Sequence, residues 1–482
     1  MTTFSLLNFG CRASQADGAA LKRQLLESGL TEAGQDAASD IAILNTCTVT
    51  AAADAEVRQT IRRTHRQNPA CKILVTGCYA QRAPEELAAL DGVAWVVGNS
   101  HKHVIPSLLW PAGAPVSLRG RAADSGAEVW TGEPSAQFHF LPVFPDDRTR
   151  PTLKVQDGCN ARCSFCIIPS VRGRSRSLPP EEAVTQVHAL EAAGYQEVVL
   201  SGINLGGYGR DLSRSITFLG LLEKLLEETG IRRLRISSIE PMDVTPELLR
   251  LAASEKRVAD HFHVPLQSGC DRILRRMNRR YWAAQYAERV LAVRESMPHC
   301  GIGADVMTGF PGESDSEHAE SARFIESMPF TYLHVFPFSA RPGTAAASRP
   351  DQLNGRIAHE RGRELRAAID RKRHAFLSSQ LGRTVSALTL SDGGEDGISA
   401  MSSNYLALCL PGSQCGSNRM LDACVTRLSQ GRLYGYEVFS PEPSSRRPAR
   451  GGRAQDLATV RASGSSSLDP ADGVHGAACD WT

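Results

Sequence analysis

Short apolar runs alternate with amphipathic helical stretches twice along this chain of 482 residues. In the first series the apolar runs are TTFSLLNF, IAILNT, KILVTG and VAWVVG. Strands that alternate with helices must pair in parallel and bury both faces of the sheet under the helices. We therefore expect a doubly wound α/β domain over residues 1–110.

The second series begins at Thr152 and contains six apolar runs, each followed by a helical stretch. The runs are TLKVQ, EVVLSG, RLRISS, HFHVPL, GIGADVMTG and YLHVFPF. Six parallel strands with intervening helices indicate a partial (β/α)6 barrel over residues 151–375. The chemistry of such a barrel lies at the carboxyl ends of its strands.

The remaining segments carry other patterns. Residues 111–150 are rich in Pro, Gly, Ala and Ser without a period, which is typical of a linker. Residues 378–440 alternate short strands with Gly, Ser and Asp turns, which predicts a small β-barrel. Residues 441–482 are rich in Pro, Gly, Ser and Arg and poor in core formers, so we expect a disordered tail.

Composition limits the partners of the chain. The net charge is only +2, so any affinity for nucleic acid must come from local patches and not from an overall basic field. The N-terminus shows no basic segment followed by a long apolar run, and no stretch of eighteen apolar residues occurs. We therefore expect a soluble, cytoplasmic protein that has no membrane partner.

Three cysteines follow three strands of the predicted N-terminal sheet. Cys11, Cys47 and Cys78 each lie within a residue or two of a strand's carboxyl end. Ligands of open parallel sheets bind outside these carboxyl ends, so the three thiols can meet although more than thirty residues separate them. The sequence thus predicts a site that the topology assembles.

A second group of thiols lies in the stretch VQDGCNARCSFCIIP, on the loop after the first barrel strand. Cys159, Cys163 and Cys166 have no fourth Cys or His close in sequence, whereas structural zinc takes four such ligands. Three thiolates on a four-iron cluster would leave one iron open for a substrate or cofactor. Chance cysteines or a labile zinc site are the alternative.

The spacing of these three cysteines, with Phe165 before the last, resembles the radical S-adenosylmethionine superfamily. The resemblance implies that the open iron binds the amino and carboxylate groups of S-adenosylmethionine, which one electron cleaves to a 5′-deoxyadenosyl radical. It also implies cofactor contacts for residues at the strand ends, although Phe165 can equally belong to the core. These expected contact residues are Phe165, Gly202, Gly206, Gly207, Ser238 and Gln267.

Further motifs narrow the resemblance to the methylthiotransferases of this superfamily. The motifs are NFGCRASQAD, LNTCTVT, VTGCYAQ, QDGCNARCSFCIIP, GFPGE and FPFSARPGTAA. Members have an N-terminal cluster-binding domain, a radical domain and a C-terminal TRAM domain, which is an RNA-binding β-barrel. The resemblance implies two [4Fe-4S] clusters, the second on Cys11, Cys47 and Cys78, together with an electron donor such as flavodoxin or ferredoxin and a sulfur source.

The stretches NTCTVT, GCYAQ and GINLGGYG are most similar to the enzymes that act on tRNA anticodon stem-loops carrying threonylcarbamoyladenosine at position 37. The expected product is the 2-methylthio derivative of that nucleoside. Three alternatives stay open: isopentenyladenosine in tRNA, an aspartate of a ribosomal protein, and a non-catalytic RNA-binding module in which metal is a structural clip.

Basic residues near the cysteine loop are candidates for RNA contacts, because the predicted C-terminal barrel carries few of them. We expect Arg172, Arg174 and Arg176 to contact phosphate groups. A second basic run, which ends at Arg279 and Arg280, offers the same chemistry. The alternative for both runs is a solvated surface.

Overall fold

The computed structural model describes residues 2–34, 37–109, 126–134, 140, 149–213, 215–391, 397–412 and 415–438. Residues Met1–Val438 form one compact unit. The predicted tail and most of the predicted linker lie outside the described residues.

The N-terminal part is a six-stranded parallel sheet, which confirms the predicted doubly wound domain. Its strand order is β2-β1-β3-β4-β5-β6. The last strand falls within the predicted linker and pairs with β5, so this part of the linker completes the sheet. The strands are β1 (Thr3–Asn8), β2 (Thr31–Glu32), β3 (Ile41–Thr46), β4 (Lys72–Gly77), β5 (Val93–Gly98) and β6 (Glu128–Trp130).

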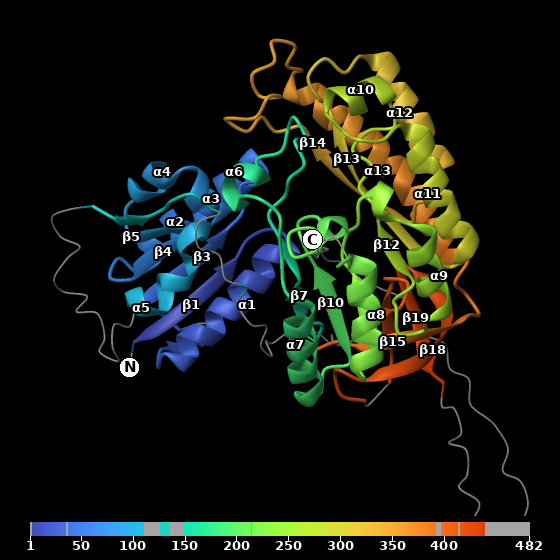
Figure 1. The fold of residues 1–482 in the computed structure, drawn as a ribbon, viewed down its shortest axis with the longest axis horizontal. Helices are drawn as coiled ribbons and strands as arrows, with labels where there is room; N and C mark the ends of the chain where they lie inside the picture. The colour runs from blue at the N-terminus through green and yellow to red at the C-terminus, as the bar shows by residue number, and fades with distance from the viewer. Residues whose placement is uncertain are drawn as a thin grey trace, which may run out of the picture. The chain divides into compact units, whose positions relative to one another are not determined.

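Helices cover both faces of this sheet because alternate residues of each strand point to opposite sides. Ile41 and Ile43 pack with residues of α1 and α5, and Ala42 and Leu44 pack with residues of α2, α3 and α4. Figure 1 shows these helices around the blue strands. Their bounds are α1 (Arg12–Glu27), α2 (Ala51–Gln67), α3 (Cys78–Arg82), α4 (Pro84–Ala88) and α5 (Ile105–Leu109).

The six predicted barrel strands form two parallel sheets of three strands, in the orders β11-β10-β7 and β12-β13-β14. A single bridge between Leu234 and Val258 connects the two sheets. No pairing between β7 and β14 occurs in the described part of the chain, so the barrel is partial, as predicted. The strands are β7 (Thr152–Lys154), β10 (Glu197–Ser201), β11 (Arg233–Ile236), β12 (His261–His263), β13 (Gly301–Thr308) and β14 (Tyr332–Pro337).

The predicted first strand, TLKVQ, is divided in two. After β7 the chain forms β8 (Gln156–Asp157), which pairs antiparallel with β9 (Arg176–Ser177). The cysteine loop and the short helix α6 (Ile168–Arg172) lie between β8 and β9. This small ribbon closes the base of the loop that carries the second group of thiols.

Helices cover the outer side of the barrel strands (Figure 1). Apolar residues of these helices and of the strands pack together into one large core. Val198 and Leu200 of β10 belong to this core, whereas Glu197 and Ser201 lie on the inner face. The helices are α7 (Pro180–Ala192), α8 (Phe218–Glu228), α9 (Pro246–Ser254), α10 (Asp271–Arg276), α11 (Ala283–Ser296), α12 (Asp315–Ser327) and α13 (Gly355–Ser378).

The C-terminal part is a closed five-stranded barrel in the order β15-β16-β17-β19-β18, which confirms the predicted small β-barrel. It adjoins the inner face of β11, where Arg235 donates to the carbonyl groups of Ser402 and Ser403, each at 3.0 Å. The strands are β15 (Thr384–Thr389), β16 (Ile398–Ser402), β17 (Ala407–Leu410), β18 (Met420–Ser429) and β19 (Arg432–Glu437).

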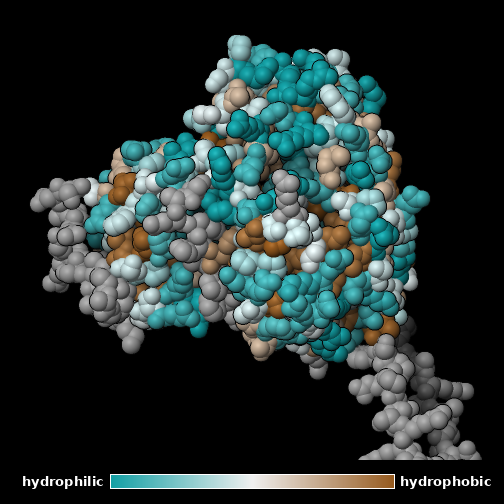
Figure 2. Space-filling model, viewed as in Figure 1, coloured by the Kyte–Doolittle hydropathy of each residue, from teal (hydrophilic) through white to brown (hydrophobic). Residues whose placement is uncertain are grey.

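The surface over α10 and α12 is mainly hydrophilic, as Figure 2 shows. Among the helices that the structure describes, none has both the length and the apolar character that crossing a membrane requires.

Candidate functional site

The structure brings the three N-terminal cysteines together. Strands β1, β3 and β4 are direct neighbours in the sheet, and Cys11, Cys47 and Cys78 follow their carboxyl ends. Burial, together with the charges of Cys11 and Cys78, raises the pKa of Cys47 to about 12. The three sulfur atoms are therefore close enough to interact electrostatically.

Two glycines allow this approach. Gly10 has a φ of +95°, and a Cβ atom there would lie 2.4 Å from Cβ of Cys47. Gly77 has a φ of +101°, and its Cβ would lie 2.4 Å from the carbonyl oxygen of Thr46. Only glycine tolerates both the left-handed backbone and the close contact.

The second group of thiols lies on the loop between β8 and α6. Burial raises the pKa of Cys166 to about 12, and the charges of Cys163 and Cys159 contribute in the same direction. The sulfur of Cys163 accepts a hydrogen bond from Nη1 of Arg279 at 3.3 Å. The amide of Ala161 donates to the sulfur of Cys159 at 3.3 Å.

Neither thiol group has the compact geometry of a mononuclear zinc site. Zinc bound tetrahedrally at 2.3 Å requires sulfur atoms about 3.8 Å apart. In the described part of the chain, three metal-ligating side chains lie within 4.8 Å of one another only at His263, Asp305 and His334. Two sets of three wider-spaced thiols instead fit a four-iron cluster that keeps one iron open.

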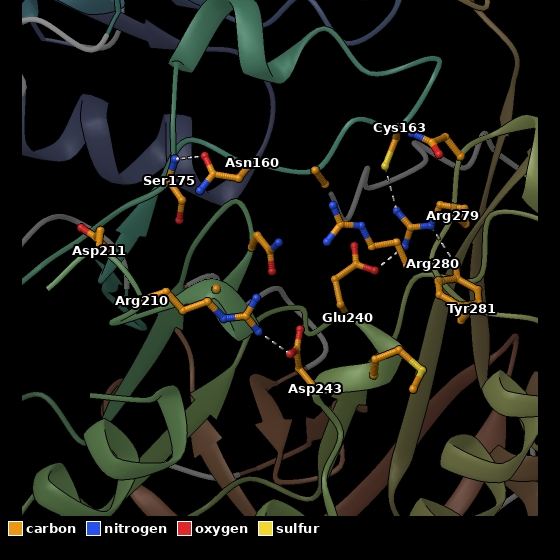
Figure 3. Close-up of a pocket in the computed structure, with 15 residues that line it drawn as sticks. Asn160, Cys163, Ser175, Arg210, Asp211, Glu240, Asp243, Arg279, Arg280 and Tyr281 are labelled. Atoms are coloured by element: carbon orange, nitrogen blue, oxygen red, sulfur yellow. Dashed lines mark hydrogen bonds and ion pairs between the residues drawn. The ribbon is translucent and has the colours of Figure 1, made fainter. Parts of the chain in front are cut away.

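A cavity of about 440 Å³ adjoins the second thiol group. Figure 3 shows Asn160, Cys163, Glu240, Arg279 and Tyr281 around it, from the cysteine loop and from segments that follow β11 and α10. The cavity therefore lies at the carboxyl ends of the barrel strands, where the fold class predicts chemistry.

Two ion pairs line this cavity. The Glu240 carboxylate pairs with Arg279, and Arg210 pairs with Asp243 at 3.2 Å. Burial raises the pKa of Glu240, whereas Arg279 opposes that rise. A cavity with carboxylates and guanidinium groups beside a thiol can hold a zwitterion such as an amino acid.

The predicted glycines lie near the cavity, but only Gly207 lines it. A Cβ atom at Gly206 would lie 1.8 Å from Oδ2 of Asp243, so this glycine permits direct contact between the loop and that carboxylate. Gly202 lies against Gln156, where a Cβ would come within 2.9 Å of the Gln156 Cβ.

The other three predicted cofactor residues do not line the cavity. Phe165 and Met307 both pack against a small apolar cluster that contains the buried Phe310, which is the core role that the sequence left open for Phe165. Ser238 is half-buried after β11. Gln267 has a φ of +67°, an uncommon conformation that occurs often at functional sites.

The structure places Arg172 in the interior and not on a surface that RNA could contact. Its side chain is 2% exposed, and its guanidinium pairs with Asp157 at 2.9 Å and with Asp17 at 3.1 Å. A buried arginine with two carboxylate partners is not available to phosphate groups, so the prediction is wrong for Arg172. Arg176 is half-buried and donates to the carbonyl oxygen of Pro134, whereas Arg174 is exposed.

These charges form a buried network between α1 and the cysteine loop. Lys154 contacts both Asp17 and Asp157, and Lys102 pairs with Asp17 at 2.8 Å. Burial alone would raise the pKa of Asp157, but Arg172 and Lys154 lower it to about 2. Since three cations face two carboxylates, the network retains positive charge. Cys78 and Cys11 interact electrostatically with Arg172, so this charge lies near the N-terminal thiols.

Sequence reasoning missed the role of Arg279. The sequence places it in a basic run that suggests phosphate contacts, but its side chain is 7% exposed and contacts Cys163 and Glu240. Its partners are 116 and 39 residues away along the chain, so no local pattern identifies it.

Two family models match the chain. The model of the radical SAM superfamily matches residues 153–325, and that of uncharacterized protein family UPF0004 matches residues 3–98. The second match coincides with the sheet that carries the N-terminal thiols.

Curated relatives extend over most of the chain. The threonylcarbamoyladenosine tRNA methylthiotransferases MtaB of Aquifex aeolicus and Bacillus subtilis are 38% and 37% identical. These alignments cover 80% and 78% of this chain, and 92% and 82% of the relatives. The tRNA-2-methylthio-N(6)-dimethylallyladenosine synthase of Pelotomaculum thermopropionicum is 33% identical over 75% of this chain and 80% of its own length.

Among solved structures, the radical S-adenosylmethionine methyltransferase TsrM from Kitasatospora setae, with cobalamin and a [4Fe-4S] cluster bound, is similar in fold. The TM-score is 0.53 at 14% sequence identity, and the match covers 72% of this chain and 77% of the other. At this level of identity the match shows a similarity of fold over about three quarters of the chain.

Proposed function

The chain belongs to the radical S-adenosylmethionine methylthiotransferases, and we propose that it converts N6-threonylcarbamoyladenosine at position 37 of tRNA to the 2-methylthio derivative. The observation that supports this function most strongly is the 38% identity to an MtaB enzyme, in an alignment that covers 92% of that relative. The family's cofactors are a [4Fe-4S] cluster and S-adenosylmethionine.

The chemistry explains why thiols and not acid-base residues dominate the site. The C2–H bond of adenine has no useful acidity, so a general base cannot open it. When bound, a four-iron cluster and S-adenosylmethionine would supply the radical chemistry that this bond requires. Cys159, Cys163 and Cys166 would hold the cluster, and the cavity with Glu240 and Arg279 would bind the charged methionine end.

The N-terminal thiols would hold a second four-iron cluster that takes part in sulfur transfer. The convergence of Cys11, Cys47 and Cys78 at one sheet edge supports this role. The buried charge network around Arg172 supports it as well, because its positive charge offsets the negative charge of a thiolate-bound cluster.

Each part of the chain would have its own role in this reaction. Residues 1–110 would be the cluster-binding domain, 111–150 the linker, 151–375 the radical domain and 378–440 the TRAM-like barrel. The anticodon stem-loop would contact exposed basic residues such as Arg174, and the half-buried Arg176 would lie at the edge of this contact surface. An electron donor such as flavodoxin or ferredoxin and a sulfur source would complete the reaction, and the tRNA substrate implies the cytoplasm.

Nucleoside analysis of tRNA from a strain that lacks the gene tests the function. We expect the 2-methylthio derivative of threonylcarbamoyladenosine to disappear and the unmodified precursor to accumulate. The wild-type gene on a plasmid should restore the product, and a Cys163→Ala gene should not. An unchanged level of that product would contradict the proposal, and loss of methylthio-isopentenyladenosine instead would support the other tRNA substrate.

A further inference from the structure

Arg12 directly follows Cys11 and begins α1. Its side chain is partly exposed, and its Nη2 donates to the hydroxyl of Tyr405 at 3.2 Å. Within the residues that the structure describes, Arg12 forms no ion pair with a carboxylate. In the described part of the chain, the guanidinium group of the residue after Cys11 therefore has a tyrosine hydroxyl and no carboxylate as its partner.

The side chain that Arg12 contacts belongs to a polar wall inside the barrel. The ring of Tyr405 stacks on His261 with a centroid distance of 4.4 Å and lies 5.7 Å from Tyr332. The Tyr332 hydroxyl bonds to ring nitrogens of both His261 and His263, at 2.7 and 3.0 Å. The C-terminal barrel, α1 and the strands β12 and β14 meet at this point.

The wall continues toward the radical-generating loop. Oδ1 of Asp305 lies 3.1 Å from Nε2 of His263 and 3.2 Å from Nδ1 of His334. The side chains of Asp305 and His334 are 28% and 36% exposed, so a ligand can reach them. We define the polar wall as Tyr405, His261, Tyr332, His263, Asp305 and His334.

The strand period places this wall close to the second thiol group. Met307 follows Asp305 by two residues on the same face of β13 and packs in the apolar cluster with Phe165, the neighbour of Cys166. Two residues of a strand span about 7 Å. The polar wall thus extends from near the Cys166 loop to Arg12, which is the neighbour of Cys11.

Arginines give this end of the wall a positive potential. Burial alone would raise the pKa of Tyr405, yet the charges of Arg12, Arg150 and Arg235 lower it. Burial and the same arginines lower the pKa of His261. The Glu197 carboxylate pairs with Arg150 and Arg235 and so compensates their charges. Arg12 has no such carboxylate partner among the described residues, so its charge is not compensated.

We propose that Arg12 binds the carboxylate of the threonylcarbamoyl group, and that Asp305 and His334 hydrogen-bond its urea and hydroxyl groups. This inference rests on the proposed function, and it names the residues that would make the enzyme specific for threonylcarbamoyladenosine. C2 and C6 flank N1 of the adenine ring, and C6 carries N6. When C2 faces the thiols, the N6 substituent therefore lies against the adjacent wall.

An apolar N6 substituent would leave this wall desolvated and without partners. Sites built to hydrogen-bond a polar group reject analogues that lack it far more strongly than apolar pockets reject an added polar group. The polar wall would therefore exclude dimethylallyladenosine although relatives that act on that nucleoside share the fold.

Three anticodon stem-loops test the assignment. One carries threonylcarbamoyladenosine, the second carries its carboxamide analogue, and the third carries dimethylallyladenosine. We expect Arg12→Gln to lower kcat/KM for the first stem-loop by about 10- to 100-fold, the range of a lost charge-assisted hydrogen bond. The same variant should change kcat/KM for the carboxamide less than about threefold, and Arg12→Lys should recover part of the loss.

Arg23→Gln is the matched control, because Arg23 lies on the same helix and pairs with Glu27 on the exposed side. It should leave both substrates unaffected. Iron content and 5′-deoxyadenosine formation are measured in parallel, since Arg12 neighbours a cluster ligand. An equal loss for carboxylate and carboxamide substrates would overturn the role of Arg12.

Binding to the wild-type protein provides a second test that needs no variant. Fluorescence anisotropy should show at least tenfold weaker binding of the carboxamide stem-loop, and equal affinities would overturn the inference. A wild-type protein that methylthiolates the dimethylallyladenosine stem-loop but not the threonylcarbamoyladenosine stem-loop would instead overturn the proposed function.

Discussion

At the scale of single residues, a buried guanidinium group lies near each of the two groups of thiols. Arg279 donates to Cys163, and Arg172 interacts with the charges of Cys78 and Cys11. Burying a charge is costly unless an opposite charge and hydrogen bonds compensate it. Carboxylates already compensate much of this charge, since Arg172 pairs with Asp17 and Asp157 and Arg279 pairs with Glu240. Thiolates that bind iron would add further negative charge near both arginines.

Arg279→Gln should weaken the second thiol site. The substitution removes the donor to Cys163 and leaves the half-buried Glu240 carboxylate without its cation. We expect 5′-deoxyadenosine formation to fall at least tenfold and less iron to be retained, with partial recovery in Arg279→Lys. Arg250→Gln, on the exposed surface of α9, is the control. Unchanged iron and product in Arg279→Gln would contradict this role.

Each thiol of the second group should be indispensable for cofactor cleavage. Removing Cys159, Cys163 or Cys166 leaves two protein ligands, too few to retain a four-iron cluster that needs an open iron. We expect Ala substitution at any of the three to abolish 5′-deoxyadenosine formation. A wild-type rate in one purified variant would refute the ligand assignment.

The sequence predicts the thiols but not their surroundings. Cys159, Cys163 and Cys166 are recognisable because they are neighbours along the chain, and the strand ends identify the other three. Arg172 and Asp17 are 155 residues apart, and only the folded chain brings them together. The basic run around Arg172 suggested an RNA contact because sequence does not reveal burial.

At the scale of elements, strong periodicity predicted most strands, and short elements were missed. Strand β6 has three residues and lies in a segment rich in Gly and Ala, so no pattern marks it. The break between β7 and β8 also leaves no signal, because Val155 continues the apolar pattern while the ribbon with β9 redirects the chain.

Helix α12 provides a prediction on local stability. Ser314 and Glu317 form a capping box, and Glu317 also pairs with Arg272. Loss of the N-cap in Ser314→Ala should cost about 1 kcal/mol. Hydrogen exchange of the amides in the first turn of α12 should accelerate in this variant, whereas Ser327→Ala, at the exposed other end of the helix, should leave these amides as in the wild type. Equal exchange in both variants would contradict the capping role.

The same helix should respond to pH in a defined direction. The hydrogen bond from Arg272 lowers the pKa of Glu317 to about 2 from an ordinary value of 4.5, and the Ser314 bonds contribute. A lowered pKa stabilises the folded state above pH 4.5, and this contribution is lost as the pH falls toward 2. The difference in α12 protection between wild type and Glu317→Gln should therefore shrink below pH 4.5.

At the scale of the whole molecule, one buried carboxylate joins the partial barrel to the C-terminal barrel. Glu197 pairs with Arg233 at 3.2 Å and with Arg235 at 2.7 Å. Both arginines also donate to groups of the C-terminal barrel, including Ser386 Oγ at 2.7 Å. The sequence predicts each barrel but not this contact, since it depends on residues more than 150 positions apart.

Glu197→Gln should loosen the C-terminal barrel. Burial would raise the pKa of Glu197, but Arg235, Arg233 and Arg150 lower it to about 2, so the carboxylate is ionised at neutral pH. Its removal leaves buried cations unpaired, at a cost of about 3–5 kcal/mol. Limited proteolysis should cut before β15 faster in Glu197→Gln than in Glu228→Gln, an exposed control on α8. Equal cleavage would contradict the coupling.

The central claim is that two sets of three thiols hold two clusters with separate tasks. The most direct test is anaerobic reconstitution of wild type and Cys47→Ala, with iron, 5′-deoxyadenosine and methylthiolated tRNA measured on the same samples. The account predicts about eight irons in the wild type, half as many in the variant, continued formation of 5′-deoxyadenosine and no methylthiolated product. Unchanged iron, or methylthiolation that persists in Cys47→Ala, would contradict it.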